Sequence, residues 1–408
     1  MNITLEDIRR AAKQIQPGIV HTPCFPSPKL SQKSGAAIFL KFENRQFTGS
    51  FKDRGSLFKL ESLSAEQRER GVVAMSAGNH AQAVAYHSQR LGIPATIVMP
   101  QFTPSVKVER TQNFGAQVQL FGDTLDAAKT VADKLARDQQ LTLIHPYDDP
   151  LIMAGQGSVA LEMLADCREL DTLVVPIGGG GLISGIAIAA KALRPNLKIF
   201  GVQTTRYPSM HDAIAAKQPR FGNATIAEGI AVKTPGTHTL PVIQSLVDDI
   251  LLVEETEIEQ AIRLLMEVEK TVVEGAGAVG VAALLKYGDR FTDRRVGIVL
   301  SGGNIDEIIL SAILERCLVR DQRLVRIQVN IQDVPGSLAD ISKTIAETQA
   351  NVVGVQHHRM FTGLPVQSAV LEFSMLIRGE KHLETILYKL RSTGYDAFSL
   401  PLNAELVS

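Results

Sequence analysis

The sequence predicts an α/β protein in which a large parallel-sheet region precedes a small β-α-β-β-α-β module. Between about residues 38 and 310, apolar runs such as V-V-A-M at 72–75 and V-G-I-V-L at 296–300 alternate with helical patterns. Apolar strands separated by helices are typical of parallel sheets covered on both faces. The pattern changes at the polar segment 315–323, which we interpret as a linker.

The C-terminal module follows from the order of its predicted elements. We expect strands at 324–331, 351–360, 367–377 and 395–400, and helices at 337–350 and 381–392. This order is that of a ferredoxin-like domain, for which we set the bounds 324–402. Within it, D-V-P-G-S-L at 333–338 predicts a turn followed by a helix that Ser337 caps.

Composition excludes several classes of protein. The chain has 408 residues with 42 basic and 43 acidic side chains, a net charge of −1, so it lacks the basic footprint of a nucleic-acid binder. It has neither a signal-peptide core at its N-terminus nor an apolar run of the ~18 residues that span a membrane. Cys24, Cys167 and Cys317 are far apart in sequence and form no C-x-x-C pair. These features predict a cytoplasmic protein with reduced thiols.

A glycine cluster, G-G-G-G-L at 178–182, stands between a predicted buried strand and a helix. Glycines let the backbone approach an anion closely, and a helix N-terminus directs free N–H groups at it. A nucleotide P-loop needs G-K-[ST] at this point, and the dinucleotide fingerprint needs glycine or alanine where Ser184 stands. The cluster therefore predicts a phosphate site, with tight packing as the alternative interpretation.

Three further motifs carry polar groups beside predicted strand ends or helix starts. S-A-G-N-H-A-Q at 76–82 offers a helix start, capped by Ser76, that can bind a carboxylate. S-G-G-N at 301–304 places a hydroxyl and an amide at a strand end, and T-G-S-F-K at 48–52 places Lys52 directly before a helical run. A lysine, a phosphate cradle and a carboxylate-binding helix end together suit pyridoxal phosphate as cofactor.

With these motifs the chain resembles the fold type II pyridoxal-phosphate enzymes, specifically the threonine (serine) dehydratases. H-P-Y-D-D-P (145–150), A-G-Q-G (154–157), A-E-G-I-A-V-K (227–233) and V-E-G-A-G-A-V (273–279) join the motifs above in the family's order. The resemblance implies a two-lobed catalytic domain at 1–320, similar to the tryptophan synthase β chain, with a smaller lobe at about 50–148.

The resemblance also implies roles for individual residues. Lys52 matches the lysine that forms a Schiff base with the cofactor and moves the Cα proton, and Phe51 matches the residue that packs beside the ring. Asn79 matches the residue bonded to the cofactor's 3′-oxygen, and Ser301 the hydroxyl facing the ring nitrogen. The implied phosphate cradle consists of Gly178, Gly179, Gly180, Gly181 and Leu182. The implied substrate-binding loop contains Ser76, Ala77, Asn79 and His80.

A neutral hydroxyl opposite the ring nitrogen favours loss of a β-hydroxyl over transamination. The resemblance therefore implies a threonine ammonia-lyase, which converts L-threonine, and also L-serine, to 2-oxobutanoate or pyruvate and ammonia. The departing hydroxide needs a proton, from Lys52 or the cofactor phosphate. Serine racemase is the alternative of the same fold, but racemases carry serine where Ala77 stands, and alanine cannot transfer a proton.

Two groups of residues invite a metal interpretation, and only the first remains open. Related enzymes bind a mono- or divalent cation near A-E-G, so Glu228 is a candidate ligand, while Glu228 and Glu274 are equally well interpreted as structural carboxylates. His357 and His358 are neighbours in a strand, point to opposite faces, and are not expected to share a metal.

The C-terminal module resembles an ACT domain, a unit that binds amino acids. The resemblance places a regulatory ligand, isoleucine or valine, at the first turn, with the opening of the second strand nearby. The expected residues are Asp333, Pro335, Gly336, Ser337 and Leu338, with Asn351 and Val352. It also implies a homo-oligomer, a dimer or tetramer. An empty dimerisation module and a non-enzymatic amino-acid sensor are the alternatives; the presence of Lys52 argues against the sensor.

Overall fold

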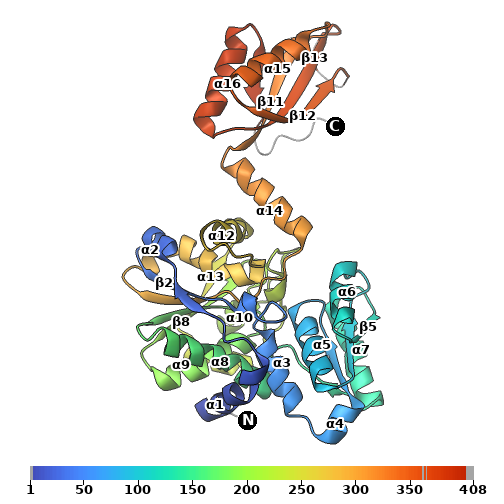
Figure 1. The fold of residues 1–408 in the computed structure, drawn as a ribbon, viewed down its shortest axis with the longest axis vertical. Helices are drawn as coiled ribbons and strands as arrows, with labels where there is room; N and C mark the ends of the chain where they lie inside the picture. Colours follow the sequence, from blue (N-terminus) through green and yellow to red (C-terminus); the bar gives the residue numbers. More distant parts are fainter. Residues whose placement is uncertain (1–2, 361–362, 364, 401–408) are drawn as a thin grey trace. The chain divides into compact units, whose positions relative to one another are not determined.

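The computed structural model describes residues 3–360, 363 and 365–400. The chain divides into two compact units, Met1–Asp306 and Glu307–Ser408 (Figure 1). The predicted module extends to residue 402, and its residues 401 and 402 lie outside the described residues.

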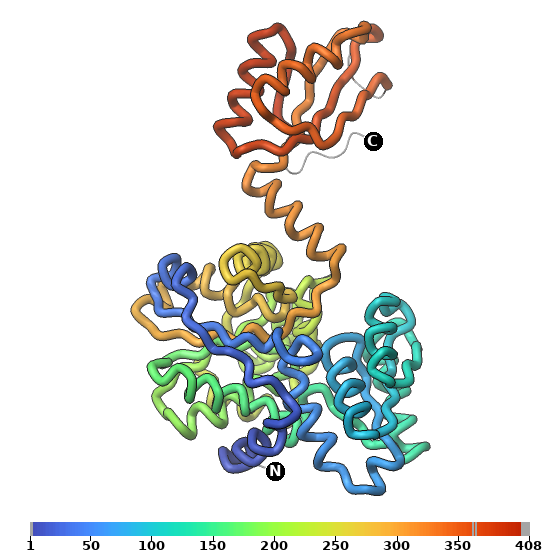
Figure 2. The backbone as a smooth tube through the Cα atoms, in the orientation of Figure 1, coloured from blue at the N-terminus to red at the C-terminus, as the bar shows by residue number. Residues whose placement is uncertain are grey.

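A six-stranded sheet forms the centre of the first unit. Its order is β1-β2-β10-β7-β8-β9, with β1 antiparallel to β2 and all other pairs parallel. Figure 2 shows how the chain returns from the end of the unit to lay β10 beside β2. The strands are β1 (Cys24–Pro26), β2 (Ala37–Lys41), β7 (Thr172–Pro176), β8 (Lys198–Thr204), β9 (Asp249–Val253) and β10 (Arg295–Val299).

A second, four-stranded parallel sheet forms a smaller lobe of the same unit, in the order β5-β4-β3-β6. Helices α5, α6 and α7 lie beside it (Figure 1). Its strands are β3 (Val72–Met75), β4 (Ala95–Met99), β5 (Gln117–Leu120) and β6 (Thr142–Leu143). Together the mainly parallel large sheet and the parallel small sheet confirm the predicted α/β class.

Thirteen α-helices of this unit surround the sheets within the described residues. They are α1 (Leu5–Ile15), α2 (Pro28–Ser34), α3 (Lys52–Glu61), α4 (Ala65–Arg70), α5 (Asn79–Leu91), α6 (Ser105–Asn113), α7 (Leu125–Asp138), α8 (Pro150–Asp166), α9 (Gly181–Leu193), α10 (Ser209–Ile214), α11 (Thr239–Leu246), α12 (Glu255–Val268) and α13 (Gly275–Lys286). A short 3₁₀ turn, η3, spans Glu228–Ile230.

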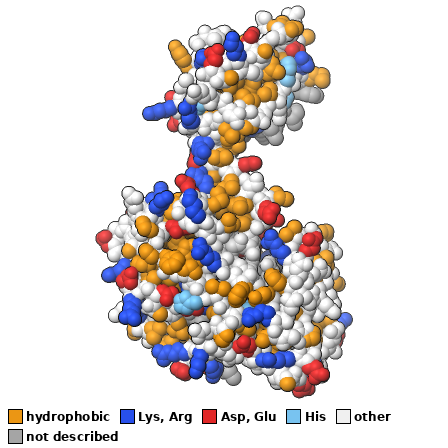
Figure 3. Space-filling view, viewed as in Figure 1, with side chains coloured by type: hydrophobic (Ala, Val, Ile, Leu, Met, Phe, Trp, Pro, Cys, Tyr) orange, Lys and Arg blue, Asp and Glu red, His pale blue; other side chains and the backbone are white. Residues whose placement is uncertain are grey.

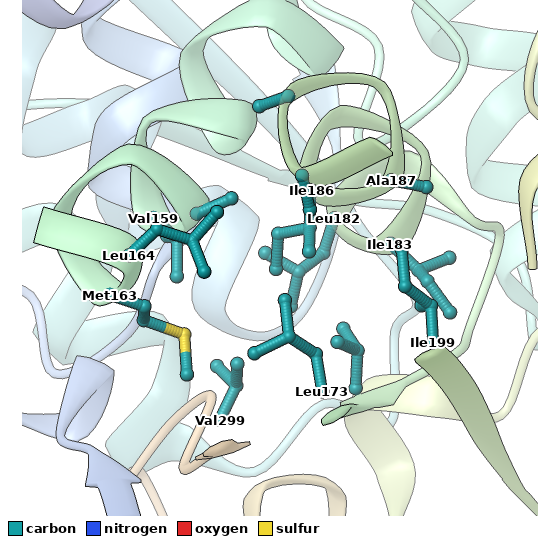
Figure 4. Packing of buried hydrophobic residues seen from close by; sticks show 14 of the residues in the cluster. Val159, Met163, Leu164, Leu173, Leu182, Ile183, Ile186, Ala187, Ile199 and Val299 are labelled. Atoms are coloured by element: carbon teal, nitrogen blue, oxygen red, sulfur yellow. The ribbon is translucent and has the colours of Figure 1, made fainter. Parts of the chain in front are cut away.

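The main core lies where α8 and α9 cover the large sheet. Figure 4 shows Met163 of α8 and Ile186 of α9 gathered with Leu173 of β7. All three side chains are fully buried. Gly157 and Gly185 bring the backbones of α8 and α9 close, because a Cβ at Gly185 would overlap α8, and Gly155 does the same for α8 and α3. Burial of this apolar surface is the main force that holds the lobe together.

A buried ion cluster fixes α3, the helix that begins at Lys52. The Arg54 guanidinium donates to Glu43 at 2.7 Å and to Glu162 at 2.7 Å, and Lys41 reaches Glu162 at 2.5 Å. Burial alone would raise the pKa of Glu43, but the charge and hydrogen bonds of Arg54, the Lys41 charge and the Thr22 hydrogen bond together outweigh it, and the pKa lies below its usual value. The cluster therefore holds α3 to α8 by paired charges deep in the lobe.

The second unit has the predicted β-α-β-β-α-β order. Its antiparallel sheet runs β12-β13-β11-β14, and one face packs on helices around Ile327, Phe373 and Ile386. The elements are α14 (Glu307–Arg320), β11 (Leu324–Gln332), α15 (Ser337–Glu347), β12 (Asn351–His358), β13 (Ser368–Leu376), α16 (Glu380–Ser392) and β14 (Asp396–Ser399).

Two local predictions in this unit are wrong. The segment 315–323 is no linker, since α14 continues to Arg320 with Ile313 and Cys317 buried one helical turn apart. Ser337 does not cap α15: Gly336 is the N-cap residue, and the Ser337 hydroxyl donates to the carbonyls of Gln332 and Val334 at 3.1 Å each. The hydroxyl closes the turn and leaves the helix end uncapped by a side chain.

Removing the Arg54 guanidinium tests the ion cluster. Arg54→Ala leaves Glu43 and Glu162 without their main partner, so we expect the free energy of unfolding to fall by about 3–5 kcal/mol. Denaturant unfolding measures this change. The matched control is Arg9→Ala, which removes an exposed i,i+3 pair with Glu6 and should cost less than about 1 kcal/mol. Equal costs for the two variants would contradict the role given to the cluster.

Candidate active site

The site is organised by two loops joined through their backbones. The loop before α3 meets the loop after β10, where Phe51 N–H donates to Ser301 O at 3.1 Å and Gly303 N–H donates to Gly49 O at 2.9 Å. Gly49 has a φ of +76°, and a Cβ there would press on the Asn304 side chain. The structure therefore brings T-G-S-F-K and S-G-G-N together, although they lie at opposite ends of the unit's sequence.

Lys52 begins α3 and is held in a desolvated position. Its Nζ donates to the carbonyl of Pro146 at 2.6 Å and lies 5.1 Å from the centre of the Phe51 ring. Burial lowers the pKa of Lys52 to about 8, although the nearby Glu274 charge opposes the shift. A lysine with a lowered pKa has a larger share of neutral amine, which is the nucleophilic form.

The glycine cluster forms the N-terminus of α9. Gly180 is its N-cap residue with a φ of +99°, a left-handed conformation that favours glycine. A side chain at Gly179 would overlap the Tyr147 ring, so the close packing that we weighed as an alternative is present as well. The first N–H groups of α9 have no acceptor within the helix and can bind a phosphate. Lys52 and Gly181 both meet the segment of residues 146 and 147.

Asn79 lies at the centre of a hydrogen-bond chain. Its Nδ2 donates to Glu274 Oε1 at 2.6 Å, and its Oδ1 accepts from Asn304 Nδ2 at 2.7 Å. Asn304 Nδ2 also donates to Thr48 O at 2.7 Å. Burial raises the pKa of Glu274 to about 7, while the Asn79 hydrogen bond opposes the shift. The chain connects the loop before Lys52 to the start of α5 and to the start of α13.

The other predicted site residues lie at the same strand ends. Ser301 is buried, and its hydroxyl donates to Ala276 O at 3.4 Å. Ser76 does not cap α5, because Gly78 is the N-cap residue and Ser76 Oγ accepts from Gly78 N–H at 3.1 Å. Ala77 is partly buried against the small-lobe core. The α5 start therefore offers backbone N–H groups without a side-chain cap.

His80 takes a buried position behind the α5 start. Its Nε2 lies 2.9 Å from Ile144 O, which makes Nε2 the protonated nitrogen. Burial lowers the pKa of His80 to about 3, so the ring is neutral. The side chain supports the helix start, and its part in substrate binding stays a prediction.

Glu228 pairs with a lysine on the small lobe. Lys107 Nζ of α6 lies 2.5 Å from its Oε2, and the Glu228 side chain is 65% exposed. Within the described residues, no group of three or more His, Cys, Asp or Glu side chains is placed to hold a metal ion. The cation at Glu228 stays a prediction.

In the second unit the predicted regulatory residues fall at two ends of the sheet. Asp333 of the first turn contacts Arg359 at 2.7 Å and His357 at 3.6 Å, both near the end of β12. Asn351 opens β12 opposite Leu376, which pairs with Leu324 at the other end of β11. The expectation that Asn351 and Val352 lie near the turn is wrong within one copy, because β12 runs toward the turn and ends there.

Sequence reasoning missed three contributors to the site. The motifs predict no catalytic or cofactor-binding role for Glu274, and none for Tyr147 or Asn304. Tyr147 packs on Gly179, and its hydroxyl donates to Thr234 O at 3.1 Å. For Glu274 and Asn304 the available signal was their place at a helix start and after a strand, whereas Tyr147 lies within the loop between β6 and α8. A further contact that the sequence did not predict lies in the main core. The sulfur atoms of Cys24 and Cys167 are 3.4 Å apart, although the two residues are far apart in sequence.

The comparisons with known proteins agree with this geometry. Residues 15–302 match the family described as pyridoxal-phosphate dependent enzyme. This chain belongs to that family. Residues 320–394 match the ACT domain, as the order of elements in the second unit indicates. Pyridoxal phosphate is therefore the cofactor of the family to which the first unit belongs.

Several relatives of this pyridoxal-phosphate enzyme cover nearly its whole length. It is 44% identical to the L-threonine ammonia-lyase of Thermotoga maritima, over 97% of this chain and 98% of that protein. It is 41% identical to the L-threonine ammonia-lyase of Geobacter sulfurreducens, over 95% and 97%. The chain also superimposes on maize serine racemase with a TM-score of 0.73 and 35% identity, over 79% of this chain and 100% of that one.

The residues present fit the cofactor of the family. The α9 N-terminus supplies N–H groups for a phosphate, and Lys52 supplies an amine of lowered pKa. Ser301 supplies a hydroxyl from the loop to which the Lys52 segment is joined, and Asn79 supplies an amide from the start of α5, connected to that segment through Asn304. Within the described residues no helix is long and apolar enough to cross a membrane. Basic and acidic side chains are interspersed on the face drawn in Figure 3, and neither sign forms a large patch there.

The raised pKa of Glu274 predicts that the free energy of unfolding depends on pH. In the cofactor-free protein the folded state keeps a proton up to about pH 7, while the unfolded state loses it near 4.5. The free energy of unfolding should therefore fall by about 3 kcal/mol as pH rises through this window, relative to Glu274→Gln. Denaturant unfolding of both proteins across the window measures the difference. If the free energy of unfolding changed with pH in the same way for both proteins, the raised pKa of Glu274 would be contradicted.

Proposed function

We propose that this chain is a pyridoxal-phosphate-dependent threonine ammonia-lyase that acts on L-threonine and also on L-serine. The products are 2-oxobutanoate or pyruvate, with ammonia. The observation that carries the proposal is Lys52, a lysine of lowered pKa held next to the loop of Ser301. The near full-length similarity to L-threonine ammonia-lyases supports the choice of substrate.

We assign the chemistry of the reaction to residues of these loops. When bound, pyridoxal phosphate withdraws electrons from the substrate's Cα. Lys52 moves the Cα proton, and the N–H groups at the start of α9 hold the phosphate. The start of α5, residues 76–80, binds the substrate carboxylate at its free N–H groups. The neutral Ser301 hydroxyl would face the ring nitrogen of the bound cofactor, and this would favour elimination over transamination.

Serine racemase is the second candidate, and the similarity to maize serine racemase favours it. Racemisation needs an acid on the face of Cα opposite the lysine. Ala77 stands where racemases carry a serine, and a methyl group cannot give up a proton. We therefore favour elimination. Formation of D-serine from L-serine, measured beside 2-oxo acid formation, distinguishes the two activities. A protein that binds amino acids without either product would be a sensor.

Loss of the lysine amine should abolish the activity. We expect Lys52→Ala to lower the rate of 2-oxo acid formation from L-threonine by at least about 10³-fold, because it removes the group that moves the Cα proton. The matched control is Lys129→Ala, an exposed lysine of α7 in the smaller lobe that pairs with Asp133, and it should keep the wild-type rate. A Lys52→Ala protein that still deaminated threonine would remove the basis of the proposal.

We also propose that the protein binds a cation, forms a homo-oligomer and is located in the cytoplasm. A mono- or divalent cation at Glu228 would displace Lys107, so activity after chelation and after exchange of monovalent ions tests it. A homo-oligomer, a dimer or tetramer, is proposed from the ACT domain. A cytoplasmic location is proposed from the reduced state expected of the cysteines.

An amino-acid effector is proposed for the ACT domain. We expect isoleucine or valine to change the rate of threonine deamination, and Asp333→Asn to weaken this effect by about tenfold, because Asp333 fixes the turn through Arg359. Titrating both amino acids against the rate measures the effect. Glu347→Gln, which removes a surface pair with Lys389 in the same unit, is the control. An unchanged rate at saturating isoleucine and valine would favour an empty dimerisation module.

A further inference from the structure

The orientation of the Asn79 amide can be read from its neighbours. At one end of the chain Thr48 O, a backbone carbonyl, can only accept a hydrogen bond, so the atom of Asn304 that faces it at 2.7 Å is Nδ2. The same nitrogen lies 2.7 Å from Asn79, where it must meet an acceptor, and this atom is Oδ1. The Asn79 Nδ2 is therefore left to face Glu274.

Glu274 is held in place by its backbone. It is the N-cap residue of α13, and its carbonyl accepts from Gly277 and Ala278 at 2.9 and 3.0 Å. Its own N–H donates to Gly302 O at 3.0 Å. The side chain makes no capping hydrogen bond to α13 and reaches Asn79 instead. A Cβ at Gly302 would overlap its carboxyl, so the glycine of S-G-G-N leaves the room that the carboxyl occupies.

We propose that Glu274 is a positioning residue that fixes the Asn79 amide with its Nδ2 toward the cofactor. Asn79 Nδ2 carries two hydrogens, and Glu274 takes one of them, which leaves the other as a donor for the cofactor's oxygen. Without an acceptor at Glu274, only Asn304 would hold the amide, and Nδ2 would lose its fixed direction. The inference rests on the proposed function, since it assumes that the cofactor meets Asn79.

A positioning role and a role of the negative charge at residue 274 predict different effects of substitution. The charged groups that act on Glu274 are Lys52, Lys107 and Glu228. If its charge mattered, a glutamine would fail as badly as an alanine. If its place as an acceptor matters, glutamine can present its side-chain oxygen to Asn79 Nδ2 and restore the contact. The pair Glu274→Gln and Glu274→Ala therefore separates the two roles.

The test is a titration of pyridoxal phosphate into the cofactor-free full-length protein, followed by the visible absorbance of the bound cofactor. We expect Glu274→Ala to weaken cofactor binding about 10- to 100-fold and to shift the visible band, and Glu274→Gln to stay within about threefold of wild type. The matched control is Glu267→Ala, an exposed glutamate of α12, which should bind as wild type does.

A second variant tests the other end of the hydrogen-bond chain, at Asn304. Asn304→Asp replaces the donor that faces Thr48 O and Asn79 Oδ1 with an acceptor, so cofactor binding should fall by about tenfold or more. Wild-type binding by Glu274→Ala and Asn304→Asp would overturn the inference, as would a Glu274→Gln protein as weak as Glu274→Ala. If the wild-type protein itself bound no pyridoxal phosphate, the proposed function would fail as well.

Discussion

Two backbone hydrogen bonds between the loop before α3 and the loop after β10 determine the geometry of the site. They join Phe51 to Ser301 and Gly49 to Gly303, and they set where Lys52 stands relative to the large sheet. Because α3 is also held to α8 by the Arg54 cluster, the lysine is fixed from both sides. Burial disfavours the charged form of the amine, and these contacts hold the amine at its buried position.

The hydrogen-bond chain from Thr48 through Asn304 and Asn79 to Glu274 also fixes the geometry of the site, here mainly through side chains. Its members come from the loop before α3, the start of α5, the start of α13 and the loop after β10. Buried amides cost free energy unless they are paired, so each member limits how the next can turn. A site assembled in this way holds its donors in one direction before any ligand arrives, which lowers the cost of binding.

The sequence predicted what depends on local pattern. Parallel strands, the helix start at Gly181 and the place of Lys52 follow from runs of neighbouring residues, and the structure has them. Contacts across long separations could not be predicted in the same way. Glu274 lies 195 residues from Asn79, and Glu162 lies 108 from Arg54. The wrong placement of Asn351 has the same origin, because it depends on which end of β12 meets the first turn.

The register of the second unit has a consequence for regulation. Asn351 and the turn at Asp333 lie at opposite ends of a sheet whose strands span about 25 Å, far more than a single amino acid can bridge. A ligand that contacts both sets of residues would have to draw them from two chains. Its binding would then be linked by mass action to association, and its apparent affinity would rise with protein concentration.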